Sequence, residues 1–187
     1  MNKPIIGLDL DGVIIDNSKI KLAIAKKLGF DLNIKETPSE IIKTKLPHEK
    51  LRQLQILIYD DPIVSLGLPL MRGAKEVLTK IKKRGFKYYL ISRRRKPEIA
   101  IEFLKDKKLW PAYFDIANSF FVTEPKEKNE KSEKLGINSF LDDELHVLAE
   151  MDHVKNRFLF DPFDVCHDLG SYIRKVQNWK QFLSQLV

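Results

Sequence analysis

Two aspartates near the start of the chain, Asp9 and Asp11, are separated by one residue and followed by Gly12. They come directly after a short apolar stretch that is typical of a buried strand. Because alternate side chains of an extended chain point the same way, both carboxylates are expected to leave the strand end toward one site. Buried charge is costly unless a cation or strong donors compensate it. The alternative is a turn-capping aspartate with ordinary turn residues after it, but the position behind a first apolar strand favours chemistry.

A second acidic pair, Asp142 and Asp143, follows the apolar residues Phe140 and Leu141. The carboxyl ends of parallel strands meet at one edge of a sheet, so this pair is expected near the first one. Up to four carboxylates would then converge, which is the oxygen-rich environment that a hard divalent cation prefers. Capping of the helical stretch that follows is the alternative, less favoured interpretation, and the two are compatible.

A hydroxyl and a group of lysines complete the candidate chemistry. Ser92 ends another apolar run, where its hydroxyl can donate a hydrogen bond to a phosphate oxygen or simply cap a turn. One lysine is needed to balance the acidic cluster and an anionic ligand, yet any single lysine is more often solvated. The candidates are Lys126, Lys128, Lys131 and Lys134.

The elements that must position these residues alternate along the chain. Short apolar runs typical of strands covered on both faces occupy residues 4–10, 87–92, 118–123, 138–142 and 157–161. Helical patterns occupy residues 73–84, 97–107 and 144–151, and a last short helix opens at Asn178. This alternation predicts an α/β fold, a doubly wound Rossmann-like parallel sheet with helices on both faces.

One long segment, residues 17–70, interrupts the alternation. Residues 37–40 predict a helix start with Thr37 as the cap, residues 46–49 predict another, and an apolar stripe follows. We expect a small helical insertion above the carboxyl edge of the sheet, where ligands bind in such folds. The expected division is a core of residues 1–16 and 71–187 with a helical cap of residues 17–70.

The bulk composition is that of an ordinary globular chain. Of 187 residues, 43% are hydrophobic and 32% are charged, and Cys166 is the single cysteine. No apolar run approaches the roughly 18 residues of a membrane span, so we expect no membrane association and a cytoplasmic protein. The net charge of +7 permits anionic ligands, although solvated lysine faces are the simpler explanation for it.

These residues, in order along nearly the whole chain, resemble the four motifs of the haloacid dehalogenase (HAD) superfamily. The matching pieces are Asp9-Leu10-Asp11-Gly12-Val13, Ser92, a later lysine and Leu141-Asp142-Asp143. Residues 69–74 resemble the return from a C1-type cap, and residues 178–180 resemble a common closing helix. Within the superfamily, the short cap and double aspartate look most like the 5'(3')-deoxyribonucleotidase group and related nucleotidases.

The resemblance implies a role for each matching residue. Asp9 would attack phosphorus and form an aspartyl-phosphate, and Asp11 would protonate the leaving alkoxide and then activate water. Ser92 and a lysine would hold the phosphate; Lys128 has the best-matching offset, with Lys126 second. Mg²⁺ would be held by Asp143, with Asp142 beside it, by the Asp9 carboxylate and by the main-chain carbonyl of Asp11.

The function that follows is magnesium-dependent hydrolysis of a small phosphomonoester, with a nucleoside monophosphate as first candidate. Ser92 is followed by an unusually basic loop, Arg93 to Lys96, which either grips a further phosphate or carries solvated charges. That loop motivates an alternative, a phosphatase for nucleic-acid ends, although nucleic acid is not the expected partner. A non-catalytic binding protein is the third candidate. A phosphonatase would need a Schiff-base lysine in the helical insertion, and no lysine there is marked by the sequence as desolvated. The sequence does not indicate an oligomeric state.

Overall fold

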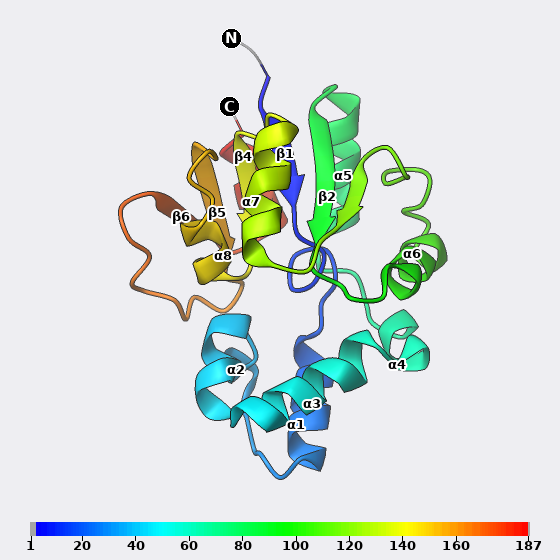
Figure 1. Cartoon of the computed structure of the whole chain (residues 1–187), viewed down its shortest axis with the longest axis vertical. Helices are drawn as coiled ribbons and strands as arrows, with labels where there is room; N and C mark the ends of the chain where they lie inside the picture. Colours follow the sequence, from blue (N-terminus) through cyan, green and yellow to red (C-terminus); the bar gives the residue numbers. More distant parts are fainter. Residues whose placement is uncertain (1–2, 187) are drawn as a thin grey trace.

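The computed structural model describes residues 3–186, which form a six-stranded, all-parallel sheet with helices on both faces (Figure 1). The strands are β1 (Ile5–Leu8), β2 (Lys87–Ser92), β3 (Ser119–Phe121), β4 (Ser139–Asp142), β5 (Asn156–Phe160) and β6 (Ile173–Val176). Their spatial order is β3-β2-β1-β4-β5-β6. The predicted doubly wound α/β fold is confirmed.

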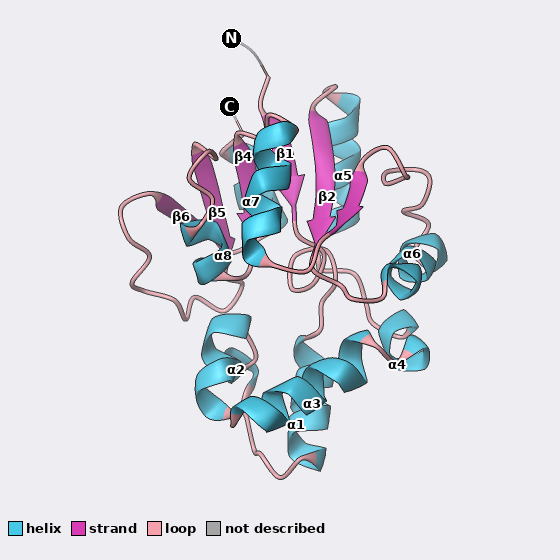
Figure 2. Cartoon of the chain, in the orientation of Figure 1, coloured by secondary structure: helices cyan, strands magenta, loops and turns pink. Residues whose placement is uncertain are grey.

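The helices divide between the sheet and the long insertion (Figure 2). The insertion contains α1 (Ser18–Lys27), the 3₁₀ turn η1 (Ile34–Glu36), α2 (Ser39–Lys45), α3 (His48–Tyr59) and α4 (Pro62–Leu66). The sheet is flanked by α5 (Ala74–Lys83), α6 (Pro97–Asp106), α7 (Pro125–Lys134), α8 (Leu145–Ala149) and α9 (Trp179–Ser184).

The sheet separates two apolar clusters because neighbouring residues of one strand face opposite sides. In β4, Leu141 belongs to the larger cluster, which includes side chains of α5, α6 and α9, whereas Phe140 belongs to the smaller cluster with side chains of α8. The Trp179 indole is fully buried in the larger cluster and donates a hydrogen bond to the carbonyl of Val13, 2.9 Å away. Helix α9, which begins at Trp179, therefore holds the loop after β1 in place.

The strand order sets where the functional edge lies. β1 pairs with β2 on one side and β4 on the other, with Leu8 opposite both Leu90 and Leu141. The chain order reverses between β1 and β4, and in open parallel sheets such a reversal opens a crevice at the carboxyl ends of the strands. The backbone N–H of Asp9 still pairs with Leu141, at 2.9 Å, so the residues that end β1 and β4 remain side by side.

The helical segment α1–α4 lies beyond that carboxyl edge (Figure 1). The two stretches that join it to the sheet are hydrogen-bonded to each other: Asp16 N–H donates to the Pro69 carbonyl at 3.0 Å, and Met71 N–H donates to the Ile14 carbonyl at 2.8 Å. Among the described residues, no helix is long and apolar enough to cross a membrane. The division into core and cap domains at these stretches stays a prediction.

Three local expectations differ from the structure, and each difference has a physical reason. Helix α7 escaped prediction because its buried residues are Lys128 and Ser132 and it has no apolar stripe. Strand β6 was not predicted, because it is short and half exposed and so has no continuous apolar run. Thr37 is not the cap of α2: its hydroxyl donates back to the Ile34 carbonyl at 2.8 Å, and α2 begins at Ser39.

The register of β1 predicts a large penalty at Gly7. A methyl group there would lie 2.2 Å from the Phe140 ring, so Gly7→Ala is expected to lower the free energy of unfolding by about 1–3 kcal/mol through overpacking. The matched control is Gly67→Ala, because Gly67 has an ordinary helical backbone and its methyl group would meet nothing closer than 3.4 Å. Urea unfolding of both variants checks this, and equal stabilities would contradict the packing of β1 on β4.

Candidate active site

The centre of the site is a buried ammonium between two carboxylates. The Nζ atom of Lys128, from α7, lies 2.6 Å from Asp9 Oδ1 and 2.6 Å from Asp142 Oδ2. All three side chains are nearly or fully buried. α7 therefore brings its one buried cation to the point where β1 and β4 end, and this explains why a polar helix is held against the sheet.

Burial and the neighbouring charges shift the pKa values of the buried lysine and carboxylates in opposite directions. Burial disfavours the Lys128 ammonium, but Asp142 and Asp9 outweigh it and hold the pKa of Lys128 above its usual range. Burial raises the pKa of Asp9 to about 7, with Lys128 acting in the opposite direction. Burial also raises the pKa of Asp142 and of Asp143. One lysine therefore does not compensate all three carboxylates, and a further cation would.

The acidic cluster suits a hard metal ion. Asp9, Asp142 and Asp143 each place a carboxylate oxygen within 4.8 Å of the others. Oxygen-only ligands of this charge fit Mg²⁺. Both oxygens of Asp142 already accept hydrogen bonds, one from Lys128 and one from the backbone N–H of Glu144. Asp143 lines the cavity, so of the two residues it is the one better placed to bind a metal ion there.

The glycine after the first acidic pair is required by Asp143. Gly12 has a φ of +79°, which L side chains rarely adopt, and a methyl group there would lie 2.4 Å from Asp143 Oδ2. The turn after β1 can approach the end of β4 this closely only because position 12 has no side chain.

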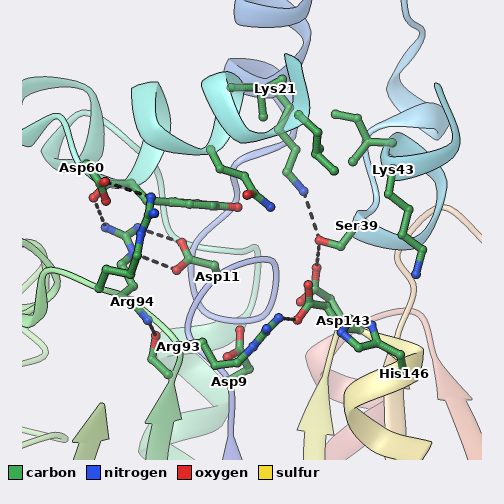
Figure 3. Close-up of a pocket in the computed structure, with 18 of the residues that line it drawn as sticks. Asp9, Asp11, Lys21, Ser39, Lys43, Asp60, Arg93, Arg94, Asp143 and His146 are labelled. Carbon is green, nitrogen blue, oxygen red and sulfur yellow. Dashed lines mark hydrogen bonds and ion pairs between the residues drawn. The ribbon is translucent and has the colours of Figure 1, made fainter. Parts of the chain in front are cut away.

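A cavity of about 420 Å³ opens between the acidic cluster and the helical segment (Figure 3). Its sheet side includes Asp9, Asp11, Ser92 and Asp143, and its opposite side comes from α1, α2 and α3. Ser92 is almost fully buried, and its Oγ accepts a hydrogen bond from the Arg94 N–H at 3.2 Å. Lys126, with 83% of its side chain exposed, lies on the outside of α7, so Lys128 is the lysine that the structure brings to the site.

Three of the four carboxylates that were expected to converge do so, and Asp11 has a different partner. The guanidinium of Arg94 holds both Asp11 oxygens, with Nε and Nη2 each 2.7 Å from one of them. Its Nη1 donates to Ser65 Oγ at 2.6 Å, and its guanidinium lies over the Tyr59 ring, 5.1 Å from the centroid. Arg94 thus connects Asp11 to α3 and α4.

The interpretation of the basic loop as solvated is wrong for Arg94, which is 4% exposed. Its neighbours are also paired, Arg93 with Glu144 and Arg95 with Asp60. Composition cannot distinguish such a side chain from a solvated one, because the partner comes from a distant part of the chain.

The helical segment also reaches the acidic cluster directly. Ser39, at the start of α2, donates from Oγ to Asp143 Oδ2 at 2.7 Å. Lys21 of α1 is 3% exposed, and burial lowers its pKa. The sequence marked no lysine of this segment as desolvated, and the burial of Lys21 shows that this interpretation was wrong. The available signal was helical spacing, since Lys21 lies on the same face as the buried residues Ile24 and Ala25.

Comparisons with known proteins support the fold. No family model matches the sequence, and no curated protein matches it. The structure superposes on a HAD-family hydrolase from Deinococcus radiodurans R1, solved with bound phosphate and sodium (TM-score 0.66, 14% identity, 99% of this chain and 97% of that chain). It also matches a predicted phosphatase from Clostridium acetobutylicum (TM-score 0.65, 12% identity, 100% and 99% of the chains). The chain has the fold of the HAD hydrolases.

A third match has the same architecture, a HAD-superfamily hydrolase of subfamily IA from Geobacter sulfurreducens (TM-score 0.60, 17% identity, 99% and 97% of the chains). These solved structures are matched over nearly their full length, so the likeness includes the helical segment as well as the sheet. The identities are low, and what the likeness shows is therefore the fold. Activity has to be argued from the site.

Removal of the central ammonium should be costly. Lys128→Met leaves Asp9 and Asp142 facing each other without a cation, and we expect a loss of about 3–5 kcal/mol in unfolding free energy, measured in EDTA. The two carboxylates then bind protons more tightly in the folded than in the unfolded chain. The deficit should therefore be largest near neutral pH and shrink as the pH falls toward 5.

The control for this experiment is Lys126→Met, two residues away on the exposed face of α7. It should stay within about 0.5 kcal/mol of the wild type. Equal losses for the two variants, or a Lys128→Met deficit that is independent of pH, would contradict the buried network.

Proposed function

We propose that this chain is a magnesium-dependent phosphomonoester hydrolase that acts through an aspartyl-phosphate on Asp9. The observation that carries the proposal is the Asp9–Lys128–Asp142 network at the base of a cavity, with contacts of 2.6 Å on both sides of the lysine. Asp9 lines that cavity, and Lys128 holds only one of its two carboxylate oxygens, Oδ1. This arrangement suits an anionic nucleophile that must meet an anionic phosphate.

The reaction divides into two displacements. A carboxylate oxygen of Asp9 attacks phosphorus, the bond from phosphorus to the ester oxygen breaks, and Asp11 gives its proton to the departing alkoxide. Water then attacks the phosphorus of the aspartyl-phosphate, Asp11 takes a proton from that water, and the bond from phosphorus to Asp9 breaks to release inorganic phosphate. Covalent catalysis of this kind splits one difficult step into two easier ones.

Charge neutralisation is the main demand of phosphoryl transfer. Lys128 neutralises Asp9 and Asp142. We propose that it also meets a phosphate oxygen, and that Ser92, which lines the cavity at the end of β2, offers its hydroxyl to another. Asp9 and Asp143, backed by Asp142, would hold Mg²⁺, which supplies positive charge between nucleophile and phosphate when bound.

Arg94 sets the orientation of Asp11. In the structure both oxygens of Asp11 are held by the guanidinium, which keeps the carboxylate away from the acidic cluster. Protonation of a leaving group requires one oxygen to turn from Arg94 toward the ester oxygen. Because Arg94 is also bonded to Ser65 of α4, the position of the helical segment and the position of the acid are coupled.

The substrate is a small phosphomonoester, because the cavity of about 420 Å³ is enclosed by α1–α3 on one side. The nucleoside monophosphate suggested by the sequence stays a prediction. The alternative of a phosphatase for nucleic-acid ends rested on the basic loop after Ser92. That argument is weakened, because Arg93, Arg94 and Arg95 each have a carboxylate partner within the chain. The pairing of Asp11 with Arg94 would also serve a non-catalytic binding protein, so phosphate release has to distinguish that candidate from the hydrolase.

Phosphate release from a panel of phosphomonoesters tests the proposal. Release by the wild type should require Mg²⁺ and stop in EDTA, and Asp9→Asn should lower kcat by a factor on the order of 10³ or more, as loss of a nucleophile does elsewhere. The panel includes nucleoside monophosphates and non-nucleotide esters. Release that survives in Asp9→Asn, or in EDTA, would refute this mechanism.

Asp11→Asn tests the proton-transfer role separately. We expect kcat for alkyl phosphates to fall about 10²- to 10⁴-fold. The first step with p-nitrophenyl phosphate needs no acid because its leaving group is stable as an anion, so a burst of nitrophenol should precede slow turnover. Asp60→Asn is the control, since Asp60 also lines the cavity but pairs with Arg95. The absence of a burst, or equal losses in both variants, would contradict the assignment.

A further inference from the structure

Lys21 is a buried cation that lacks a counter-ion within the described part of the chain. Its side chain lines the cavity and is 3% exposed, yet no carboxylate of residues 3–186 lies within 4.0 Å of its ammonium. The other lysine and arginine side chains that line the cavity are all paired. Those partners are Glu40 for Lys43, Glu144 for Arg93, Asp11 for Arg94 and Asp60 for Arg95.

The ammonium of Lys21 has one donor left for a ligand. It donates to the Thr37 carbonyl at 3.0 Å and to Ser39 Oγ at a longer 3.4 Å. An ammonium group has three N–H donors. In Figure 3 the amine enters from the helical segment and points into the pocket, across from Asp9. The third N–H is therefore left for a ligand in the cavity.

The nearest negative charges do not serve as its partner. Asp143 and Glu144 act on Lys21 at longer range, but Asp143 belongs to the acidic cluster and Glu144 pairs with Arg93. A buried charge without a partner is costly, so the location of Lys21 is explained if a ligand in the cavity brings the missing negative charge.

The transferred phosphate is not that charge. On the proposed mechanism the phosphate lies at the sheet side of the cavity, against Asp9 and Ser92, whereas Lys21 comes from α1 on the opposite side. An anion at Lys21 therefore belongs to the leaving group of the substrate. One free donor and a single positive charge match one oxygen of a singly charged carboxylate, and the apolar side chains of Ile42, Leu51 and Leu54 nearby suit a short carbon chain.

We propose, on the basis of the proposed function, that Lys21 binds a carboxylate on the leaving group. The preferred substrates are then small phosphorylated hydroxy acids, and Lys21 is the residue that selects them over phosphomonoesters whose leaving group carries no charge, nucleoside monophosphates included.

The test uses two pairs of esters that differ in the carboxylate. The first pair is 3-phosphoglycerate and glycerol 3-phosphate, and the second is 2-phosphoglycolate and 2-hydroxyethyl phosphate. Their dissociation constants are measured by calorimetry on Asp9→Asn with Mg²⁺, which binds without turnover. We expect the acid of at least one pair to bind about 10-fold or more tighter than its neutral partner, the scale of a hydrogen bond to a charged group.

Two further variants assign that preference to Lys21. Adding Lys21→Met to Asp9→Asn should bring acid and neutral ester to within about 3-fold of each other, by weakening the acid alone. Adding Lys43→Met, which removes a cavity lysine already paired with Glu40, should leave the preference intact. Circular dichroism checks that each variant is folded, and if Lys21→Met does not fold, the comparison on Asp9→Asn alone decides.

Equal affinities within both pairs would overturn the inference, as would a preference that persists without Lys21. Failure of the proposed function has a different signature. In that case the wild type releases no phosphate from these four esters or from any other member of the phosphomonoester panel, whatever the relative affinities.

Discussion

The arrangement of this protein depends on one interaction, the ammonium of Lys128 held 2.6 Å from both Asp9 and Asp142 inside the molecule. Two parallel strands that end side by side bring their carboxylates together, which would repel each other in a buried place without a cation. The polar helix α7 is held against the sheet by its lysine. The same charges that would destabilise an ordinary core make the end of β1 suited to phosphoryl transfer.

The helical segment α1–α4 contributes to this site through its own polar side chains. Ser39 bonds the Asp143 carboxylate, Ser65 bonds the guanidinium that holds Asp11, and Lys21 faces the cavity from the opposite side. The first two contacts join a residue of the segment to a group with a proposed role in metal binding or proton transfer, and Lys21 faces the proposed position of the leaving group. The position of the segment therefore bears on metal binding, on the orientation of the acid and on the choice of leaving group at once.

The sequence predicted the sheet and the edge where Asp9, Ser92 and Asp142 lie, because buried strands and their polar ends have a local pattern. It did not predict α7, whose burial depends on distant carboxylates and not on an apolar stripe. The choice of Lys128 rested on a family resemblance for the same reason. The burial of Arg94 and of Lys21 was missed, since a charge that is paired or enclosed by remote elements has the same local sequence as a solvated one.

The most direct test of the account is chemical trapping at Asp9. The protein is incubated with Mg²⁺ and p-nitrophenyl phosphate, quenched with borohydride, digested and analysed by mass spectrometry, because borohydride reduces an acyl phosphate to an alcohol and leaves a free carboxylate unchanged. We predict that position 9 is recovered as homoserine, in amounts that increase in Asp11→Asn, where the intermediate is hydrolysed slowly. Phosphate release with position 9 recovered only as aspartate would contradict the central claim that Asp9 takes the phosphoryl group.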